Sequence, residues 1–254
     1  MRSITGPAVE VIAHRGASAD APEHTLEAYD LALSHGADTL ELDVRPTADG
    51  QLVIVHDRTL WRTAGDARRV ARCTRADLDR LDPAVRPLTL DTVVTRYGHQ
   101  ANLLVELKDP EPAWELGVVD TLRRHDALDR AVVQSFDQDA LRRMKAAAPD
   151  VRVAPLFRHL PATSRRLRCL AQWADGIGVW HRAIDGLLVV RAHDAGLVVR
   201  GWTANAQNEV DRLLRLGVDG VITDVPGRVR ATVGPVPVPA AQPQPQPQPQ
   251  PVAA

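Results

Sequence analysis

Short apolar runs alternate with amphipathic segments along almost the whole chain, and this alternation limits the folds open to it. The runs expected to form strands are residues 9–13, 38–44, 102–107, 131–135, 152–156, 176–179, 197–201 and 220–223. The segments expected to form helices are residues 26–35, 90–97, 112–125, 138–148, 161–173, 186–194 and 207–216. Strand and helix patterns that alternate in this way favour a parallel sheet.

The number of repeated units favours a closed barrel over an open sheet. The chain has 254 residues, close to the ~250 residues of a typical barrel of eight strand and helix units. A doubly wound open sheet would gather its reactive residues at one switch point. Here polar residues follow several different strands, as they do at the C-terminal face of a barrel. We therefore predict an α/β fold, a single (β/α)8 TIM barrel over residues 9–232, after an N-terminal extension of residues 1–8.

Two segments depart from the regular alternation. After a tight turn at Asp49-Gly50, residues 52–55 read as an extra strand, and residues 57–86 are irregular with one helix candidate at 75–81. We expect this short insertion after the second strand to fold over the barrel mouth. Residues 233–254 end in alternating Pro and Gln, which predicts a disordered, extended C-terminal tail.

Charge and cysteine content exclude several classes of function. The chain has 31 Lys and Arg against 32 Asp and Glu, so no global charge attracts nucleic acid or an anionic membrane. No apolar run approaches the ~20 residues of a membrane span, and no phosphate-binding glycine loop is present. Cys73 and Cys169 have unrelated contexts and are expected to be unpaired. We expect a cytoplasmic enzyme with a small-molecule substrate, no nucleic-acid partner and no stable membrane insertion, and with its oligomeric state open.

Two strand ends carry a pair of charged residues at positions i and i+2: Glu41 with Asp43, and Glu106 with Lys108. Glu41 and Asp43 end the second predicted strand, and because strand side chains alternate, both project to the same face. A divalent cation would relieve their repulsion, and oxygen ligands favour Mg²⁺ or Ca²⁺. Glu106 can supply a third ligand, and Lys108 can hold a phosphate oxygen beside it. The alternatives are a solvated strand for the first pair and an ordinary exposed ion pair for the second.

Two further groups can bind phosphate or move protons. His14-Arg15-Gly16 follows the first strand, where Arg offers a planar fork for phosphate, Gly allows a ligand to approach the backbone and His can carry a proton. His56 follows the extra strand, and Asp57 can orient its ring. The seven other histidines, including His24 and His35, read as surface residues.

These residues together contain what cleavage of a phosphodiester requires. The reaction needs a base for the nucleophile, an acid for the leaving alkoxide, and cations for the developing phosphoryl charge. His14 and His56, one divalent cation, Arg15 and Lys108 would fill those roles.

The motifs resemble, in order, the signature of glycerophosphodiester phosphodiesterases. The matching stretches are His14-Arg15-Gly16, residues 21–25, residues 41–44, His56-Asp57, residues 106–108, residues 201–205 and residues 217–226. The resemblance covers about residues 9–228. It implies an eight-unit barrel and a metal-dependent hydrolase of lipid and glycerol metabolism, which releases an alcohol from a glycerophosphodiester and leaves glycerol 3-phosphate.

The resemblance also implies roles for individual residues. It makes His14 and His56 the acid–base pair in either order, Glu41, Asp43 and Glu106 the ligands of one divalent cation, Mg²⁺ or Ca²⁺, and Arg15 and Lys108 the phosphate contacts. Glu23 would lie in or beside the metal site, and Trp202 would line the alcohol pocket or pack at a strand end. The family's usual Pro-Glu-Asn-Thr is Pro-Glu-His-Thr here, which leaves His24 without an assigned role.

Two alternative functions are weighed against the residues of the chain. A related phospholipase D-like activity on lysophospholipids or sphingomyelin would call for an apolar docking loop, and residues 58–86 are instead rich in Arg and Asp. An inactive barrel that binds partners through its Pro-Gln tail would not need the complete catalytic set.

Asp224 is expected to cap the last short helix.

Overall fold

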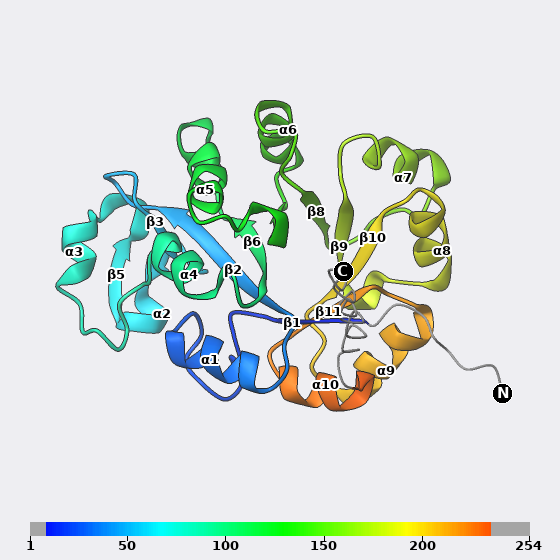
Figure 1. The fold of residues 1–254 in the computed structure, drawn as a ribbon, viewed down its shortest axis with the longest axis horizontal. Helices are drawn as coiled ribbons and strands as arrows, with labels where there is room; N and C mark the ends of the chain where they lie inside the picture. The colour runs from blue at the N-terminus through cyan, green and yellow to red at the C-terminus, as the bar shows by residue number, and fades with distance from the viewer. Residues whose placement is uncertain (1–8, 235–254) are drawn as a thin grey trace, which may run out of the picture.

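Eight parallel strands close into a barrel in the computed structural model, which describes residues 9–234 (Figure 1). In chain order the barrel strands are β1 (Glu10–Ala13), β2 (Thr39–Pro46), β6 (Asn102–Leu107), β7 (Ala131–Ser135), β8 (Val153–Phe157), β9 (Gly176–Trp180), β10 (Val198–Trp202) and β11 (Gly220–Thr223). β1 pairs with both β2 and β11, which closes the sheet. The predicted TIM barrel is therefore confirmed, and its strands lie close to their expected positions.

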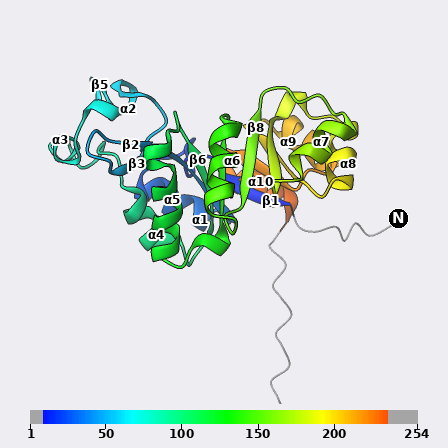
Figure 2. The same ribbon diagram turned by 90° about the horizontal axis from the view of Figure 1, so that it is seen from above.

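Helices surround the barrel, as Figures 1 and 2 show. They are α1 (Leu26–Ser34), α4 (Leu90–Tyr97), α5 (Pro112–Arg124), α6 (Gln138–Ala147), α7 (Ser164–Leu170), α8 (Gly186–Asp194), α9 (Gln207–Leu216) and α10 (Pro226–Val233). The prediction for α7 was too long at both ends. The Thr163 hydroxyl accepts a hydrogen bond from the Arg166 backbone N–H, so the helix begins after Thr163.

The insertion after β2 forms a small unit on one side of the barrel mouth (Figure 2). β3 (Leu52–Ile54) pairs antiparallel with β2, which confirms the predicted extra strand. The other elements of the insertion are β4 (Thr59–Leu60), α2 (Trp61–Ala64), β5 (Asp66–Arg69), the short 3₁₀ helix η1 (Val70–Arg72) and α3 (Arg75–Asp79). The β4–β5 hairpin was not predicted, because neither strand has an alternating apolar pattern. Buried side chains of the insertion pack with Val53 and Val55 into a separate core.

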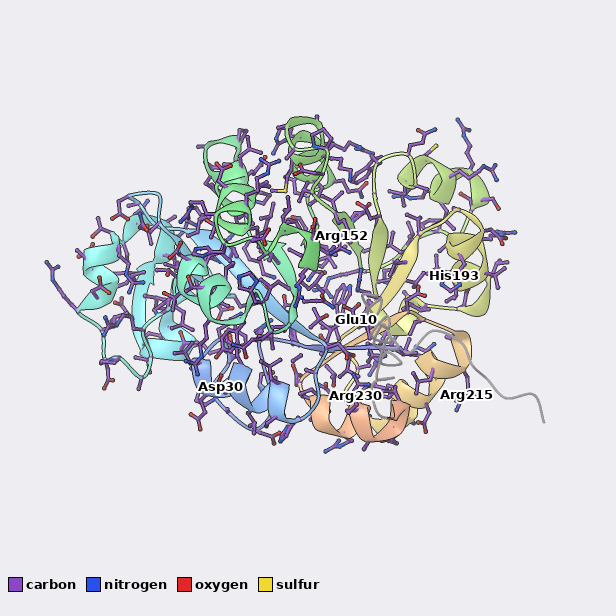
Figure 3. All side chains as sticks on the ribbon, viewed as in Figure 1. Glu10, Asp30, Arg152, His193, Arg215 and Arg230 are labelled. Carbon is purple, nitrogen blue, oxygen red and sulfur yellow. The ribbon has the colours of Figure 1, made fainter. Side chains whose placement is uncertain are left out.

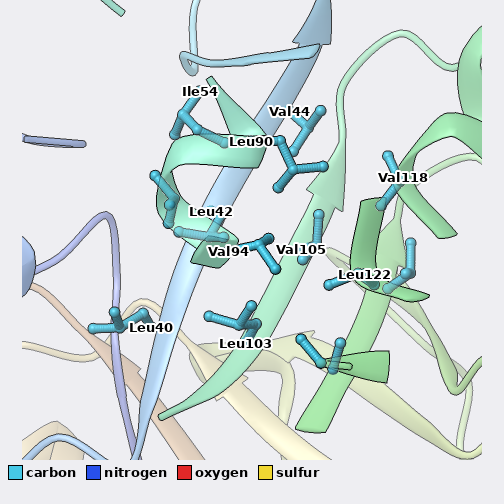
Figure 4. Close-up of a cluster of buried hydrophobic side chains, with 14 of the residues drawn as sticks. Leu40, Leu42, Val44, Ile54, Leu90, Val94, Leu103, Val105, Val118 and Leu122 are labelled. Atoms are coloured by element: carbon cyan, nitrogen blue, oxygen red, sulfur yellow. The ribbon is translucent and has the colours of Figure 1, made fainter. Parts of the chain in front are cut away.

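The core on the outer side of β2 orients the polar face of that strand. Leu40, Leu42 and Val44 are fully buried and pack in one cluster with side chains of α4 and β6 (Figure 4). Because side chains alternate along a strand, Glu41 and Asp43 point the other way, toward the barrel axis. Burial of the apolar side chains therefore fixes the direction of both carboxylates.

Some of the predictions fall outside the described residues. These are the N-terminal extension, residues 1–8, and nearly all of the proposed disordered tail, from residue 235 onward. Both cysteines are unpaired in the described part of the chain, Cys73 buried and Cys169 exposed. None of the helices between residues 9 and 234 has the length and hydrophobicity needed to cross a membrane.

We predict that Leu103→Ala will destabilise the barrel by about 2–5 kcal/mol, because the substitution leaves a cavity in a core that packs tightly. Leu103 lies on β6 with 1% of its surface exposed. Leu187→Ala on α8 is the matched control, since that side chain is 51% exposed and its truncation should change stability by about 0.5 kcal/mol or less. Urea unfolding monitored by circular dichroism measures both, and equal stability of the two variants would contradict this packing.

Candidate functional site

Three carboxylates meet inside the C-terminal end of the barrel. β2 and β6 are neighbours in parallel register, and this register places Asp43 directly opposite Glu106. Oxygen atoms of Glu41, Asp43 and Glu106 all lie within 4.8 Å of one another. All three residues are buried. The structure therefore brings together the three predicted metal ligands.

Burial and neighbouring charges raise the pKa values of two of the three carboxyl groups and lower that of the third. Burial raises the pKa of Glu41 well above its usual value, and the charges of Asp43 and Glu106 raise it further. Burial likewise raises the pKa of Glu106, reinforced by Asp43. Burial also opposes ionisation of Asp43, but a hydrogen bond from His24 and the charge of Lys108 outweigh it and hold the Asp43 pKa well below its usual range. These opposite directions favour the ionised form of Asp43 over those of Glu41 and Glu106.

The donor set fits a hard divalent cation. It consists only of carboxylate oxygens, which Mg²⁺ and Ca²⁺ prefer. Asp43 Oδ1 is buried and accepts no hydrogen bond from any described residue. Lys108 Nζ lies 3.1 Å from that oxygen as an ion pair, but the angles are not those of a hydrogen bond. A buried carboxylate oxygen with free acceptor capacity is a suitable ligand position.

Both predicted phosphate-binding cations contact these carboxylates. Lys108 Nζ bonds to Glu106 and faces Asp43. Arg15 Nε lies 3.1 Å from Asp43 Oδ2, and the Arg15 backbone N–H donates to Glu41 at 3.1 Å. The two cations partly neutralise the cluster, and both also line the adjoining cavity.

Gly16 has a different role from the expected one. We predicted that it would let a ligand approach the backbone, but a Cβ at Gly16 would lie 2.7 Å from Ala28 on α1. Gly16 also has φ +86°, in the region that favours glycine. The glycine therefore allows the loop after β1 to pack against α1, which sets the position of the neighbouring Arg15.

His14 is held by a carboxylate from the far end of the chain. Its Nδ1 lies 2.6 Å from Asp224 Oδ1, and since a carboxylate accepts, Nδ1–H is the donor and Nε2 stays available. Ser18 and Asn205 also donate to Asp224. Burial opposes ionisation of Asp224, but the bond from His14 and these others lower its pKa to about 2.

The expectation that Asp224 caps the last helix is therefore wrong. The residue before α10 is Val225, and no side chain of the described residues caps that helix. Sequence spacing could not reveal the true partner, because His14 and Asp224 are brought together only when β11 pairs with β1.

His56 has a similar arrangement on the opposite side of the site. Its Nδ1 donates to Asp57 Oδ1 at 2.7 Å, which confirms that Asp57 contacts the ring and leaves Nε2 available. Burial lowers the pKa of His56, and the charges of Lys108 and Arg15 reinforce this while Asp43 and Asp57 oppose it. Each of the two candidate catalytic rings thus has a carboxylate on its Nδ1.

His24 is buried, which contradicts its assignment to the surface. Its Nε2 donates to Asp43 Oδ2 at 2.9 Å, and its Nδ1 lies 2.8 Å from the Tyr29 hydroxyl. A carboxylate can only accept, so Nε2 carries the proton, and the neutral ring then accepts the Tyr29 O–H at Nδ1. Burial lowers the His24 pKa, which favours this neutral form. His24 therefore orients a predicted metal ligand.

His181 is a second buried histidine, which contradicts its expected position on the surface.

Glu23 lies beside the acidic cluster and is not part of it. It faces Arg15 Nη1 at 3.3 Å and bonds to both terminal nitrogens of Arg62. Glu23 lines a different cavity, between the insertion and the loop after β1. The structure thus favours a supporting position for Glu23 over direct metal ligation.

A cavity of about 170 Å³ opens beside the cluster. The residues that line it include seven predicted site residues: His14, Arg15, Glu41, His56, Glu106, Lys108 and Trp202. Trp202 packs edge-on against Phe136, with ring centroids 5.6 Å apart. Phe136 and Arg158 also line the cavity and were not predicted. Phe136 directly follows the predicted strand of residues 131–135, and Arg158 lies two residues beyond the predicted strand of residues 152–156, so their positions after strand ends could have identified them.

A second cavity at the opposite end of the barrel lacks these groups. It is lined by residues near the N-terminal ends of the strands, including Glu10 and Arg152, and by Arg230 of α10, all three of which Figure 3 labels. Arg230 bonds to Asp38 and Arg200 to Glu10, so paired charges hold this end together. The candidate catalytic groups are gathered at the C-terminal end only.

The chain is similar in sequence and in structure to members of a known protein family. Residues 14–228 match the model of the Glycerophosphoryl diester phosphodiesterase family. A Mycobacterium tuberculosis protein named probable glycerophosphodiester phosphodiesterase 1 is 36% identical, with 87% of this chain and 91% of that one covered. The glycerophosphodiester phosphodiesterase of Bacillus subtilis is 30% identical, with 85% and 83% covered. An Oleispira antarctica phosphodiesterase, solved with the product sn-glycerol-3-phosphate, is 29% identical with a TM-score of 0.78, covering 89% and 97%.

We predict that Asp224→Asn will remove a pH-dependent part of the stability. The pKa of Asp224 is about 2 in the folded protein against an ordinary value of 3.8, so its contribution is fully present above about pH 4 and is lost as the pH falls toward 2. The stability difference between wild type and variant should therefore shrink as the pH is lowered from 5 toward 2, with most of the loss below pH 4, as measured by urea unfolding. Asp120→Asn, on the exposed side of α5, should retain the wild-type profile. A difference that stays constant over this range would contradict the assigned pKa.

Proposed function

Because the chain belongs to the glycerophosphoryl diester phosphodiesterase family, we propose that it hydrolyses glycerophosphodiesters to glycerol 3-phosphate and an alcohol. We propose that the reaction requires one divalent cation and that His14 and His56 are its acid and base. The observation that carries the proposal is that two carboxylate-held histidines, two cations and the cluster carboxylates Glu41 and Glu106 line one cavity.

The cation would be held by Glu41, Asp43 and Glu106. The carboxylate donor set supports this choice, and so does Asp43 Oδ1, which accepts no hydrogen bond from the described residues. Mg²⁺ or Ca²⁺ suits such ligands. When bound, the cation would polarise the phosphoryl group and neutralise charge that develops on it. Ionisation of Glu41 and Glu106, whose pKa values are raised in this structure, would accompany its binding.

The cationic side chains would hold the phosphate group. Arg15 and Lys108 both line the cavity next to the carboxylates. A guanidinium can donate two parallel hydrogen bonds to phosphate oxygens, and the lysine provides a compact positive charge. Trp202 and Phe136 form an apolar surface on another side of the cavity, against which the carbon chain of the substrate can pack.

The two histidines would move the protons. In the reaction a P–O bond forms from the nucleophile and the P–O bond to the alcohol breaks. His14 Nε2 would take the proton of the attacking water, while His56 Nε2 would protonate the leaving alkoxide. If the glycerol hydroxyl attacks instead, the alcohol leaves a cyclic glycerophosphate, and water must then open the ring to give glycerol 3-phosphate. The reverse assignment uses the same geometry. Asp224 and Asp57 would stabilise the protonated rings and fix the nitrogen that faces the substrate.

We predict that His14→Ala and His56→Ala will each lower kcat with glycerophosphocholine by roughly 10²–10⁴-fold, the usual contribution of a positioned acid or base. Steady-state kinetics with saturating divalent cation measures this loss. His193→Ala is the matched control, because His193 also bonds to an aspartate, Asp219, but lies on the outer helix α8 (Figure 3). Its kcat should equal that of wild type. Wild-type turnover in both site variants would rule out the two-histidine mechanism.

We predict that Asp43→Asn will weaken binding of Mg²⁺ or Ca²⁺ by at least about tenfold, because a charged ligand is lost from the cluster. Isothermal titration calorimetry on chelator-treated protein gives the affinity without relying on activity. Asp109→Asn is the control, since Asp109 directly follows Lys108 in the chain but pairs with Arg45 and Arg58 and is not part of the acidic cluster. Equal affinity of the Asp43 variant and wild type would remove the acidic cluster as the metal site.

The substrate class can be tested by comparing glycerophosphocholine with lysophosphatidylcholine. A glycerophosphodiesterase should turn over the first faster in metal-replete buffer. Faster cleavage of the second would favour the phospholipase D-like alternative.

A further inference from the structure

Arg62 connects the insertion to two parts of the candidate site. Its Nε donates to Asp57 Oδ2 at 2.7 Å, and its two terminal nitrogens donate to the two oxygens of Glu23, also at 2.7 Å. Asp57 holds the Nδ1 of His56, and Glu23 faces Arg15. A single guanidinium therefore contacts the carboxylate behind one proposed proton carrier and the carboxylate behind one proposed phosphate contact.

We propose that Arg62 is a positioning residue for this hydrolase, which orients His56 through Asp57 and Arg15 through Glu23. The inference rests on the proposed function of the site. Arg62 does not line the cavity that contains the predicted catalytic groups, whereas it does line the neighbouring cavity with Glu23. It therefore acts through its two carboxylate partners and not on the substrate.

The geometry of these contacts is suited to orientation. Glu23 receives two parallel hydrogen bonds from the guanidinium, an arrangement that fixes the carboxylate plane. Asp57 uses Oδ2 for Arg62 and Oδ1 for His56, so rotation of this carboxylate would break one bond or the other. Without Arg62, Asp57 would be held by His56 alone among these contacts, and Glu23 by Arg15 alone.

The fold of the insertion determines where Arg62 lies. Arg62 belongs to α2, a single turn between β4 and β5, and the preceding Leu60 is fully buried in the separate core of the insertion. That core also includes Val53, which belongs to β3, and Val55, which follows it. Since β3 pairs with β2, the insertion is attached to the strand that carries Glu41 and Asp43. The same attachment brings Arg62 within hydrogen-bonding distance of Asp57 and Glu23.

A contribution to the stability of the fold does not by itself explain the ion pairs of Arg62. The Arg62 side chain is 47% exposed, and ion pairs at such positions typically contribute less than about 1 kcal/mol to stability. A substitution there should therefore be tolerated by the fold, which allows a positioning role to be tested directly.

The test measures kcat, KM and melting temperature of Arg62→Ala and Arg62→Lys with glycerophosphocholine and saturating Mg²⁺. We expect Arg62→Ala to lower kcat by about 10–100-fold, the size of effect seen when groups that support a catalytic residue are removed. Its melting temperature should change by less than about 3 °C. Arg62→Lys keeps the charge but cannot bond both carboxylates as a planar fork, so its kcat should lie between those of Arg62→Ala and wild type.

Arg68→Ala is the matched control. Arg68 lies on β5 of the same insertion and is 50% exposed, but it pairs with Asp66 and Asp77, away from the site. Its kcat should equal that of wild type. Equal kcat values for the Arg62 and Arg68 variants, or a loss that follows a large drop in melting temperature, would overturn the proposal.

A measurement that does not depend on turnover separates this inference from the proposed function. Long-range ¹H–¹⁵N NMR at pH 8 reports which nitrogen of neutral His56 carries the proton. Wild type should have it on Nδ1, because Asp57 accepts there, and Arg62→Ala should shift His56 toward the Nε2–H form. If wild type cleaves no glycerophosphodiester, the proposed function fails, and an unchanged His56 tautomer in Arg62→Ala would independently overturn the role of Arg62.

Discussion

The opposite placement of Asp43 and Glu106 on β2 and β6 is the constraint on which the rest of the site depends. Together with Glu41 it gathers three carboxylates in the barrel interior, where burial makes their mutual repulsion costly. Two cationic side chains partly neutralise that negative charge. Arg15 comes from the loop after β1 and Lys108 from the end of β6, and both face Asp43. A cluster of this kind is stable only with positive charge nearby, supplied by side chains or by a cation.

Around this cluster, pairs of side chains are oriented by hydrogen bonds between them. Asp224 holds His14, Asp57 holds His56, and His24 bonds to Asp43. In two of these three pairs the partners come from different segments of the chain: Asp224 follows β11 and His14 follows β1, while His24 precedes α1 and Asp43 lies on β2. Closing the barrel therefore assembles and orients the candidate site at the same time, since β11 must meet β1 before Asp224 can reach His14. The insertion adds one more support, the guanidinium of Arg62.

The sequence predicted those parts of the molecule that depend on local pattern. The barrel strands have continuous apolar runs, and the i, i+2 carboxylates at residues 41 and 43 follow from strand alternation. Other features depend on tertiary contacts. His24 is buried only because Asp43 and Tyr29 bond to both of its nitrogens, and a histidine in a loop gives no sign of this. The β4–β5 hairpin is too short and polar to be recognised, so the position of Arg62 was not predictable either.

The central claim is that the chain cleaves the bond between phosphorus and the alcohol and retains the phosphate on glycerol. The most direct measurement is ³¹P NMR of glycerophosphocholine incubated with the protein and Mg²⁺ or Ca²⁺ in ¹⁸O-labelled water. The account predicts sn-glycerol 3-phosphate as the phosphorus product, with ¹⁸O on its phosphate. Phosphocholine as the product, or no turnover with any divalent cation, would contradict it.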